Sequence, residues 1–166
     1  MKALVVYESH YGNTARIAEA IAEGIGPDAR ALTTTEATPE VVAEAELVVA
    51  GAPVMAFGLP RDSMLATIPK DMKAPVPGDL SHPSLRAWLE TLPQHHAAAA
   101  SFETRLRWSP GGATGAIDDH FHAAGFRTIA KPGKFVVKGS YGPLREGELE
   151  RAREWGAELA QAMCAG

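Results

Sequence analysis

Apolar and polar positions follow two periods along the chain. Short, nearly continuous apolar runs bounded by glycine, proline or polar residues are typical of strands buried on both faces of a sheet. Longer segments with an apolar residue every three or four positions are typical of amphipathic helices. The apolar runs predict five strands, at Lys2–Tyr7, Ala29–Thr33, Glu46–Ala50, Ala97–Phe102 and within Phe126–Lys138.

The last strand is expected to be interrupted at Lys131-Pro132-Gly133, a turn sequence. Between the strands, helical periodicity and start signals predict helices at Thr14–Ile25, Pro39–Ala45, Arg61–Thr67, Ser84–Leu92, Pro110–Ala124 and Gly147–Met163. Thr38 and Ser109 are expected as N-caps, each followed by a proline at the first helical position. Strands that alternate with helices indicate right-handed crossovers and a parallel sheet covered on both faces.

The segment from Ala52 to Pro83 departs from this alternation. It contains six prolines, which prevent a long helix across it. A connection of this length with little regular structure is typically functional or mobile.

Composition and charge narrow the function classes. The 166 residues, 46% hydrophobic and 22% charged, fit a single domain over 1–166 with a core of its own. The single cysteine, Cys164, permits neither a disulfide nor a cysteine metal site within the chain. A formal net charge of −4 argues against a nucleic-acid ligand, which requires a basic face. No apolar run has the length of a membrane span and no targeting segment precedes the first strand, so a cytoplasmic protein is expected.

The junction between the first strand and the first helix has the features of a phosphate-binding loop. After the strand, the segment Ser9-His10-Tyr11-Gly12-Asn13-Thr14 leads into the helix. The first backbone N–H groups of a helix have no partner within it, and the helix dipole adds about half a positive charge there. Gly12 permits a positive φ, the hydroxyls of Ser9 and Thr14 can donate, and Asn13 can cap the helix or donate its amide.

At these residues the chain resembles the flavodoxin family, whose first loop carries the pattern S/T-x-T-G-x-T. Tyr11 departs from that pattern, but an S-x-Y-G form is similar to that of several flavodoxin-like quinone reductases. The resemblance implies a doubly wound, five-stranded parallel sheet in three α/β/α layers. It also implies that this loop wraps the phosphate of FMN, with His10 as a contact on the solvent side of the flavin or phosphate.

Two further loops should meet the first one, because the carboxyl ends of parallel strands share one edge of the sheet. After the third strand, Gly51-Ala52-Pro53-Val54-Met55-Ala56-Phe57-Gly58 is similar to the family pattern G-x-P-T-x-x-W-G. Met55 or Phe57 can cover one face of the flavin ring, and both also suit the edge of the core. Gly58 can let a peptide turn toward the flavin, while Val54 replaces a threonine hydroxyl.

The loop after the fourth strand begins Phe102-Glu103-Thr104-Arg105 and continues to Trp108. Backbone N–H groups from Glu103 to Arg105 are expected at the pyrimidine edge of the flavin. Trp108 can stack on the ring or form a lid over the loop. An arginine here would favour negative charge on the reduced flavin. The F-E-T-R segment and the ending Gly142–Gly156 resemble flavodoxin-domain proteins that are uncharacterised, so the resemblance spans nearly the whole chain.

Other proteins of this topology fit the sequence less well. A receiver domain needs an acidic residue at the end of its third strand, where Val49-Ala50-Gly51 stands. A low-molecular-weight phosphatase needs a cysteine in its phosphate loop. The histidines do not have the spacing of metal ligands, so no metal site is expected.

The function implied by the resemblance is FMN-dependent electron transfer between a reductase and a redox partner protein. The flavin would carry the chemistry, so no side chain is expected as catalytic acid, base or nucleophile. Two alternatives stay open. One is an FMN-dependent reductase of small quinone-like acceptors, and the other is a flavin-free interaction module that retains the fold.

Overall fold

One sheet runs through the centre of the protein in the computed structural model, which describes residues 1–166. All strand pairs are parallel, and the order is β2-β1-β3-β4-β5, with β6 also paired to β4. β5 pairs with the start of β4 and β6 with its end, so the two share one edge position. The strands are β1 (Ala3–Tyr7), β2 (Ala29–Thr33), β3 (Leu47–Pro53), β4 (Ala98–Leu106), β5 (Arg127–Thr128) and β6 (Gly133–Val137).

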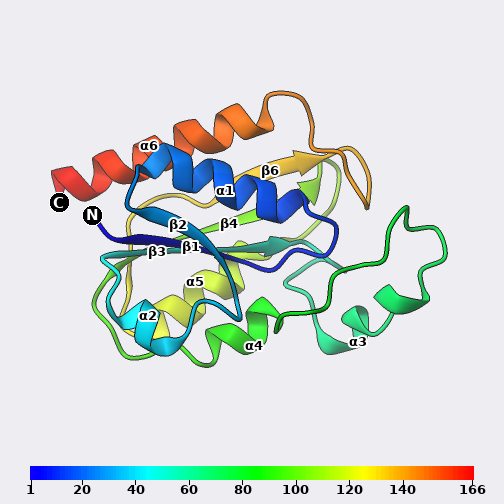
Figure 1. Cartoon of the computed structure of the whole chain (residues 1–166), viewed down its shortest axis with the longest axis horizontal. Helices are drawn as coiled ribbons and strands as arrows, with labels where there is room; N and C mark the ends of the chain where they lie inside the picture. Colours follow the sequence, from blue (N-terminus) through cyan, green and yellow to red (C-terminus); the bar gives the residue numbers. More distant parts are fainter.

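Helices cover both faces of this sheet (Figure 1). On one face lie α1 (Asn13–Ile25) and α6 (Glu148–Ala165), and a core of 17 buried residues separates them from the strands. On the other face lie α2 (Pro39–Ala43), α4 (Leu85–Leu89) and α5 (Thr114–Ala123), over a core of 20 buried residues. The doubly wound, three-layer fold predicted from the sequence is therefore confirmed.

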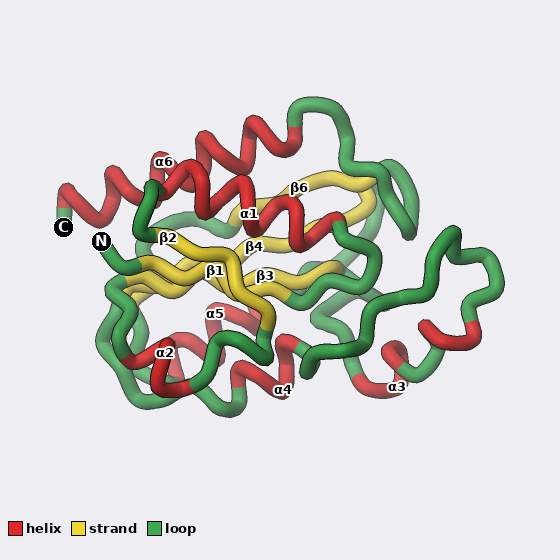
Figure 2. The backbone as a smooth tube through the Cα atoms, viewed as in Figure 1, coloured by secondary structure: helices red, strands yellow, loops and turns green.

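Most predicted elements occur, with shifted ends. The edge strand is interrupted between Thr128 and Gly133, as expected from the turn sequence. Thr38 caps α2 through its side chain, and Ser84 caps α4 in the same way. After β3 ends at Pro53, the Pro-rich segment contains only α3 (Asp62–Leu65) and a 3₁₀ turn at Ile68–Lys70, and it extends away from the sheet (Figure 2). No helix of the protein is both long and apolar enough to cross a membrane.

The predicted start of the helix at Pro110, with Ser109 as its cap, is wrong. The helix begins at Thr114, and β4 continues to Leu106 instead of ending at Phe102. The reason is that Glu103, on the extended strand, accepts hydrogen bonds from the N–H groups of Ala113 and Thr114, at 2.9 and 3.3 Å. A carboxylate from a neighbouring strand therefore performs the capping role expected of a local hydroxyl.

Helices α1 and α6 pack with their backbones in close approach. A Cβ added at Gly24 would lie 2.0 Å from the carbonyl oxygen of Arg153, and one added at Gly156 would lie 2.2 Å from that of Ile21. Glycine at both positions removes the side chains that would keep the helices apart. Helix α6 thereby lies alongside α1 on one face of the sheet, where it also packs on β6 (Figure 1).

Candidate functional site

A cavity of about 380 Å³ lies at the carboxyl ends of β1, β3 and β4. The loops that follow these strands form part of its wall, as the topology predicts for a doubly wound sheet. The predicted site residues that line it are Ser9, His10, Tyr11, Asn13, Thr14, Pro53, Val54, Met55, Thr104 and Arg105. The predicted residues outside its lining are Gly12, Phe57, Gly58, Glu103 and Trp108.

The first loop presents backbone donors that no protein group uses. Gly12 is the N-cap of α1 with φ of 92°, and its N–H donates to the Ser9 hydroxyl at 3.2 Å. The N–H groups of His10, Tyr11 and of the first three helical residues, Asn13 to Ala15, donate to no backbone carbonyl or side chain. The Asn13 side chain does not cap the helix. The loop is therefore a cluster of free amides at the positive end of a 13-residue helix.

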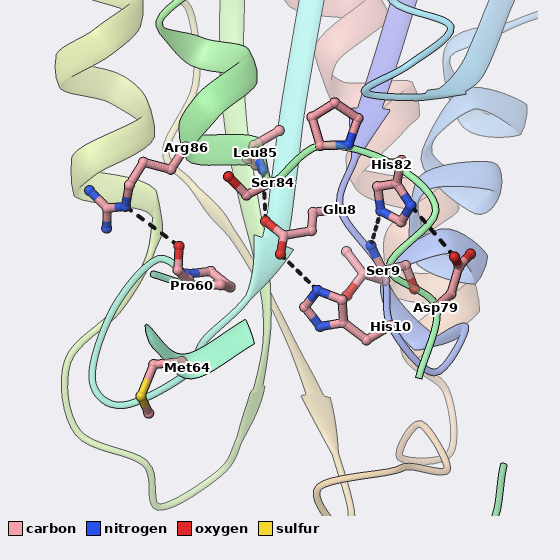
Figure 3. A network of polar contacts seen from close by, with 12 residues as sticks. Glu8, Ser9, His10, Pro60, Met64, Asp79, His82, Ser84, Leu85 and Arg86 are labelled. Atoms are coloured by element: carbon pink, nitrogen blue, oxygen red, sulfur yellow. Dashed lines mark hydrogen bonds and ion pairs between the residues drawn. The ribbon is translucent and has the colours of Figure 1, made fainter. Parts of the chain in front are cut away.

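A network of buried polar contacts joins this loop to the end of the Pro-rich segment and to the start of α4 (Figure 3). Glu8, 1% exposed, accepts a hydrogen bond from the Leu85 N–H at 2.7 Å, and its other carboxylate oxygen lies 2.7 Å from His10 Nε2. The Ser9 N–H donates to His82 Nε2 at 3.3 Å. The Asp79 N–H donates to the carbonyl oxygen of His10 at 2.8 Å. The end of the Pro-rich segment thus holds the first loop in place.

The second loop is a tight turn that points its aromatic residue outward. Met55 and Gly58 exchange two backbone hydrogen bonds, of 2.9 and 3.2 Å, across Ala56 and Phe57, whose φ values are 47° and 74°. Phe57 is 67% exposed, whereas Met55 lines the cavity with Val54. Of the two side chains predicted to cover a ring, the structure brings Met55 to the cavity.

The sequence predicted Glu103, Thr104 and Arg105 in the third loop, but they belong to β4. The loop that follows β4 is fixed by Arg105. Its guanidinium group donates to Glu103 at 2.7 Å and to the carbonyl oxygen of Gly111 at 2.8 Å, and it also donates to that of Ser109. Thr104 shares a 2.7 Å hydrogen bond with Thr14, which ties the end of β4 to the start of α1. Trp108 is 77% exposed and does not line the cavity.

Two further segments close the cavity, and sequence reasoning did not assign them to the site. The Tyr141 hydroxyl, in the loop after β6, donates to Asp71 in the Pro-rich segment, and the Tyr141 ring packs edge-on against Tyr11 at 5.1 Å. This hydrogen bond raises the pKa of Tyr141 to about 12, and together with the Lys73 N–H it lowers the pKa of Asp71. The added lining residues are Ala56, Met64, Thr67, Ile68, Asp71, Leu106, Ser109, Val137, Ser140 and Tyr141.

Nothing in the local sequence around Asp71 or Tyr141 signals their contact. The two residues are 70 positions apart, and only the return of the chain through β6 brings them together. The only feature of the sequence that pointed to a role for this region was the unusual length and proline content of the 52–83 segment.

Comparison with known proteins identifies the fold. No protein-family model matches the chain, and no curated protein matches it in sequence. Among solved structures, a flavodoxin from the domain Archaea is 20% identical with a TM-score of 0.66, covering 99% of both chains. Flavodoxin 1 from Bacillus cereus is 14% identical with a TM-score of 0.67, covering 97% of this chain and 98% of that one.

The same architecture occurs within larger proteins. The Flv1 flavodiiron core from Synechocystis is 21% identical with a TM-score of 0.65. That match covers 99% of this chain and 36% of the flavodiiron core. Together these likenesses show a flavodoxin-like fold for the whole chain.

Proposed function

We propose that the chain binds FMN in the cavity and transfers electrons from a reductase to a redox partner. The observation that carries the proposal is the set of free amides of His10, Tyr11, Asn13, Thr14 and Ala15, because four of these five residues line the cavity at the strand ends. The first N–H groups of a helix have no partner within it, and the helix dipole makes them a favourable position for an anion such as a phosphate monoester. The flavodoxin-like fold of the chain supports the same ligand.

The rest of the cavity fits a flat organic ring. Its volume of about 380 Å³ lies within the range of small-molecule sites, which is roughly 300–1,000 Å³. Val54, Met55, Met64 and Ile68 contribute apolar or polarizable surface. Thr104 contributes polar groups at the end of β4. In this proposal the first loop holds the phosphate, and these residues hold the ring.

Bound FMN would supply the redox chemistry, since a flavin accepts one or two electrons. The residues of this chain would bind and orient it. The Glu103 carboxylate and the Arg105 guanidinium keep the third loop in one conformation. The Thr14–Thr104 hydrogen bond keeps the end of β4 against the start of α1. None of these roles requires a side chain to gain or lose a proton.

A protein partner would dock by shape more than by charge. The net charge of −4 provides little long-range steering. Phe57 and Trp108 are large, exposed side chains on the second and third loops, which contact each other through the Gly112 N–H and the carbonyl oxygen of Phe57 at 3.0 Å. Exposed aromatic residues are enriched at protein interfaces.

Purification followed by flavin titration tests the proposal. We expect a yellow protein with flavin absorbance, and an apoprotein that binds FMN more tightly than riboflavin, which lacks the phosphate. A colourless protein that binds neither compound would contradict the proposal and favour a flavin-free interaction module. A spectroscopic redox titration then shows whether electrons enter singly, as expected for a carrier, or as a pair, as expected for a reductase of quinone-like acceptors.

A further inference from the structure

The buried carboxylate of Glu8 creates an electrostatic problem for any anion at the first loop. Glu8 is the residue that joins β1 to that loop, and it is 1% exposed. Because solvent and salt do not reach it, its charge is screened much less than that of a surface carboxylate. The free amides of the loop offer only partial positive charges to offset it. A dianion held there would lie close to the end of β1, where the only partners of this carboxylate are the Leu85 N–H and His10.

His10 is placed to resolve this conflict. It is 7% exposed, lines the cavity, and lies with Nε2 at 2.7 Å from Glu8. With its hydrogen on Nε2 the imidazole donates to the carboxylate, which leaves Nδ1 as the position for a second proton. Nδ1 forms no hydrogen bond in the protein and is not among the side-chain nitrogens buried without a partner, so it keeps accessible surface on a residue that lines the cavity.

We propose that the Glu8–His10 pair takes up a proton when a phosphate dianion binds at the first loop. The proton binds at His10 Nδ1 and converts the imidazole into an imidazolium. The imidazolium compensates Glu8 on one side and offers an N–H donor to the cavity on the other. The loop thereby acquires, only when the anion is present, the cation that its sequence lacks. This inference rests on the proposed function, which identifies the phosphate as that of FMN. It adds a reason why the site would prefer a ligand with a phosphate.

The other charged groups around the pair do not replace it. His82 accepts the Ser9 N–H through Nε2, so protonating that nitrogen would break the hydrogen bond. Its Nδ1 is buried without a partner, 4.0 Å from Asp79. Hydrogen bonds from Ser81 lower the pKa of Asp79, which faces His82 and His10 as an anion.

On the cavity side the titratable groups are Asp71, Tyr11, Tyr141 and Arg105. Asp71 is engaged by Tyr141, and burial followed by the charge of Asp71 raises the pKa of Tyr11. Arg105 is committed to Glu103 and to two backbone carbonyls. His10 is therefore the group left to gain a positive charge.

Calorimetry of the full-length apoprotein measures the proton directly. FMN is titrated in buffers of different ionisation enthalpy at about pH 7.5, where the phosphate is mostly a dianion because its second pKa is about 6. We expect a net uptake approaching one proton per FMN and none with riboflavin. As the pH is raised from about 7.5, the Kd for FMN should rise by up to ~10-fold per pH unit, because one proton is taken up on binding.

Two variants separate this role from a structural one. Glu8→Gln retains an acceptor for the Leu85 N–H but removes the buried charge. It should abolish the proton uptake and bind FMN at least as tightly as the wild type above pH ~8, because the repulsion is gone. A merely structural role predicts weaker binding at every pH. His10→Gln should abolish uptake and leave binding weak and independent of pH, while the exposed His96→Gln should behave as the wild type.

FMN binding without proton uptake, uptake that is equal with riboflavin, or uptake that persists in both variants would overturn the inference and leave the proposed function intact. If neither flavin binds, the proposed function is wrong, and sulfate serves as the probe because its charge is fixed near neutral pH. Sulfate-dependent proton uptake that Glu8→Gln abolishes would support the inference. No response to sulfate would overturn it.

Discussion

Glu8 and Glu103 play equivalent roles on two strands of the sheet. In the register of the sheet, Tyr7 of β1 and Phe102 of β4 both align with Gly51 of β3. Glu8 and Glu103 are the next residues along, and they flank Ala52 of β3. Each is almost fully buried and accepts a hydrogen bond from the first turn of a helix on the same face of the sheet. Each also binds a cationic or basic side chain two residues further on, His10 or Arg105. Two carboxylates therefore fix both the helices and the loops that enclose the cavity.

Replacing Gly12 by alanine should weaken FMN binding. The φ of 92° is strained for any residue with a Cβ, at a cost of about 1–2 kcal/mol, and no protein atom lies within 4 Å of the added methyl. The loop can relieve this strain only by turning its free amides away from the anion. We expect a Kd raised about tenfold or more, measured by fluorescence titration. Gly115→Ala, on an exposed helical position of α5 with open space around it, is the control and should not change the Kd.

At the residue scale, the sequence indicated the shape of the first turn because that turn is local. The Ser9 hydroxyl accepts the Gly12 N–H, and Gly12 has the positive φ that its type permits. The roles of Glu8 and Glu103 depend on partners that lie 77 positions away in the chain or behind an irregular loop. A glutamate at the end of a strand looks like a solvated residue until the helix that it caps is placed.

At the scale of elements, periodicity predicted strands and helices better than it predicted their ends. An apolar run gives the buried part of a strand, but β3 and β4 continue beyond their runs because they pair with each other as far as Pro53 and Thr104, and β6 pairs with β4 as far as Leu106. Likewise, Pro110 is a good first residue for a helix, yet α5 begins where the Glu103 carboxylate accepts its free amides. The ends are set by tertiary hydrogen bonds, which no local pattern contains.

The contact between α1 and α6 provides a sharp test of packing between elements. Gly156→Ala would place a methyl group 2.2 Å from the carbonyl oxygen of Ile21, so the helices must separate. We expect a loss of about 1–3 kcal/mol in the free energy of unfolding, measured with urea. The same change at Gly115 should be neutral or slightly stabilising. Equal stabilities for Gly156→Ala and the wild type would contradict the close approach.

The start of α6 should make stability depend on pH. Burial opposes the charge of Glu148, but hydrogen bonds from Arg151, the Val136 N–H and Arg145 outweigh it and lower its pKa from 4.5 to about 2. Because the folded pKa lies below the unfolded one, this stabilisation is present above pH 4.5 and is lost as the pH falls toward 2.

Glu148→Gln should therefore lower the free energy of unfolding at pH 7 by about 1–3 kcal/mol. The difference from the wild type should shrink as the pH falls from 4.5 to 2. Urea unfolding at several pH values measures it, with the exposed Glu154→Gln as the control. A difference that stays constant down to pH 2 would exclude the charge of Glu148 as its cause.

At the scale of the whole molecule, the cavity is a product of topology. Its walls come from five segments, namely the loops after β1, β3, β4 and β6 and residues 64–71 in the middle of the Pro-rich segment. The parallel sheet brings the ends of its strands to one edge (Figure 1). Sequence reasoning predicted the meeting of the first three loops because the strand order determines it. The other two could not be placed, since the 52–83 segment has few regular elements to fix its path.

Because these five segments meet only in the folded chain, a ligand in the cavity should stabilise the whole fold. FMN at about 100 times its Kd should add about 2.7 kcal/mol to the free energy of unfolding, which corresponds to a rise in Tm of roughly 5–10 °C for a chain of this length. Riboflavin at the same concentration should raise the Tm less, because it leaves the amides of the first loop unpaired. Thermal unfolding followed by circular dichroism measures both shifts, and equal shifts for the two compounds would place the phosphate outside the first loop.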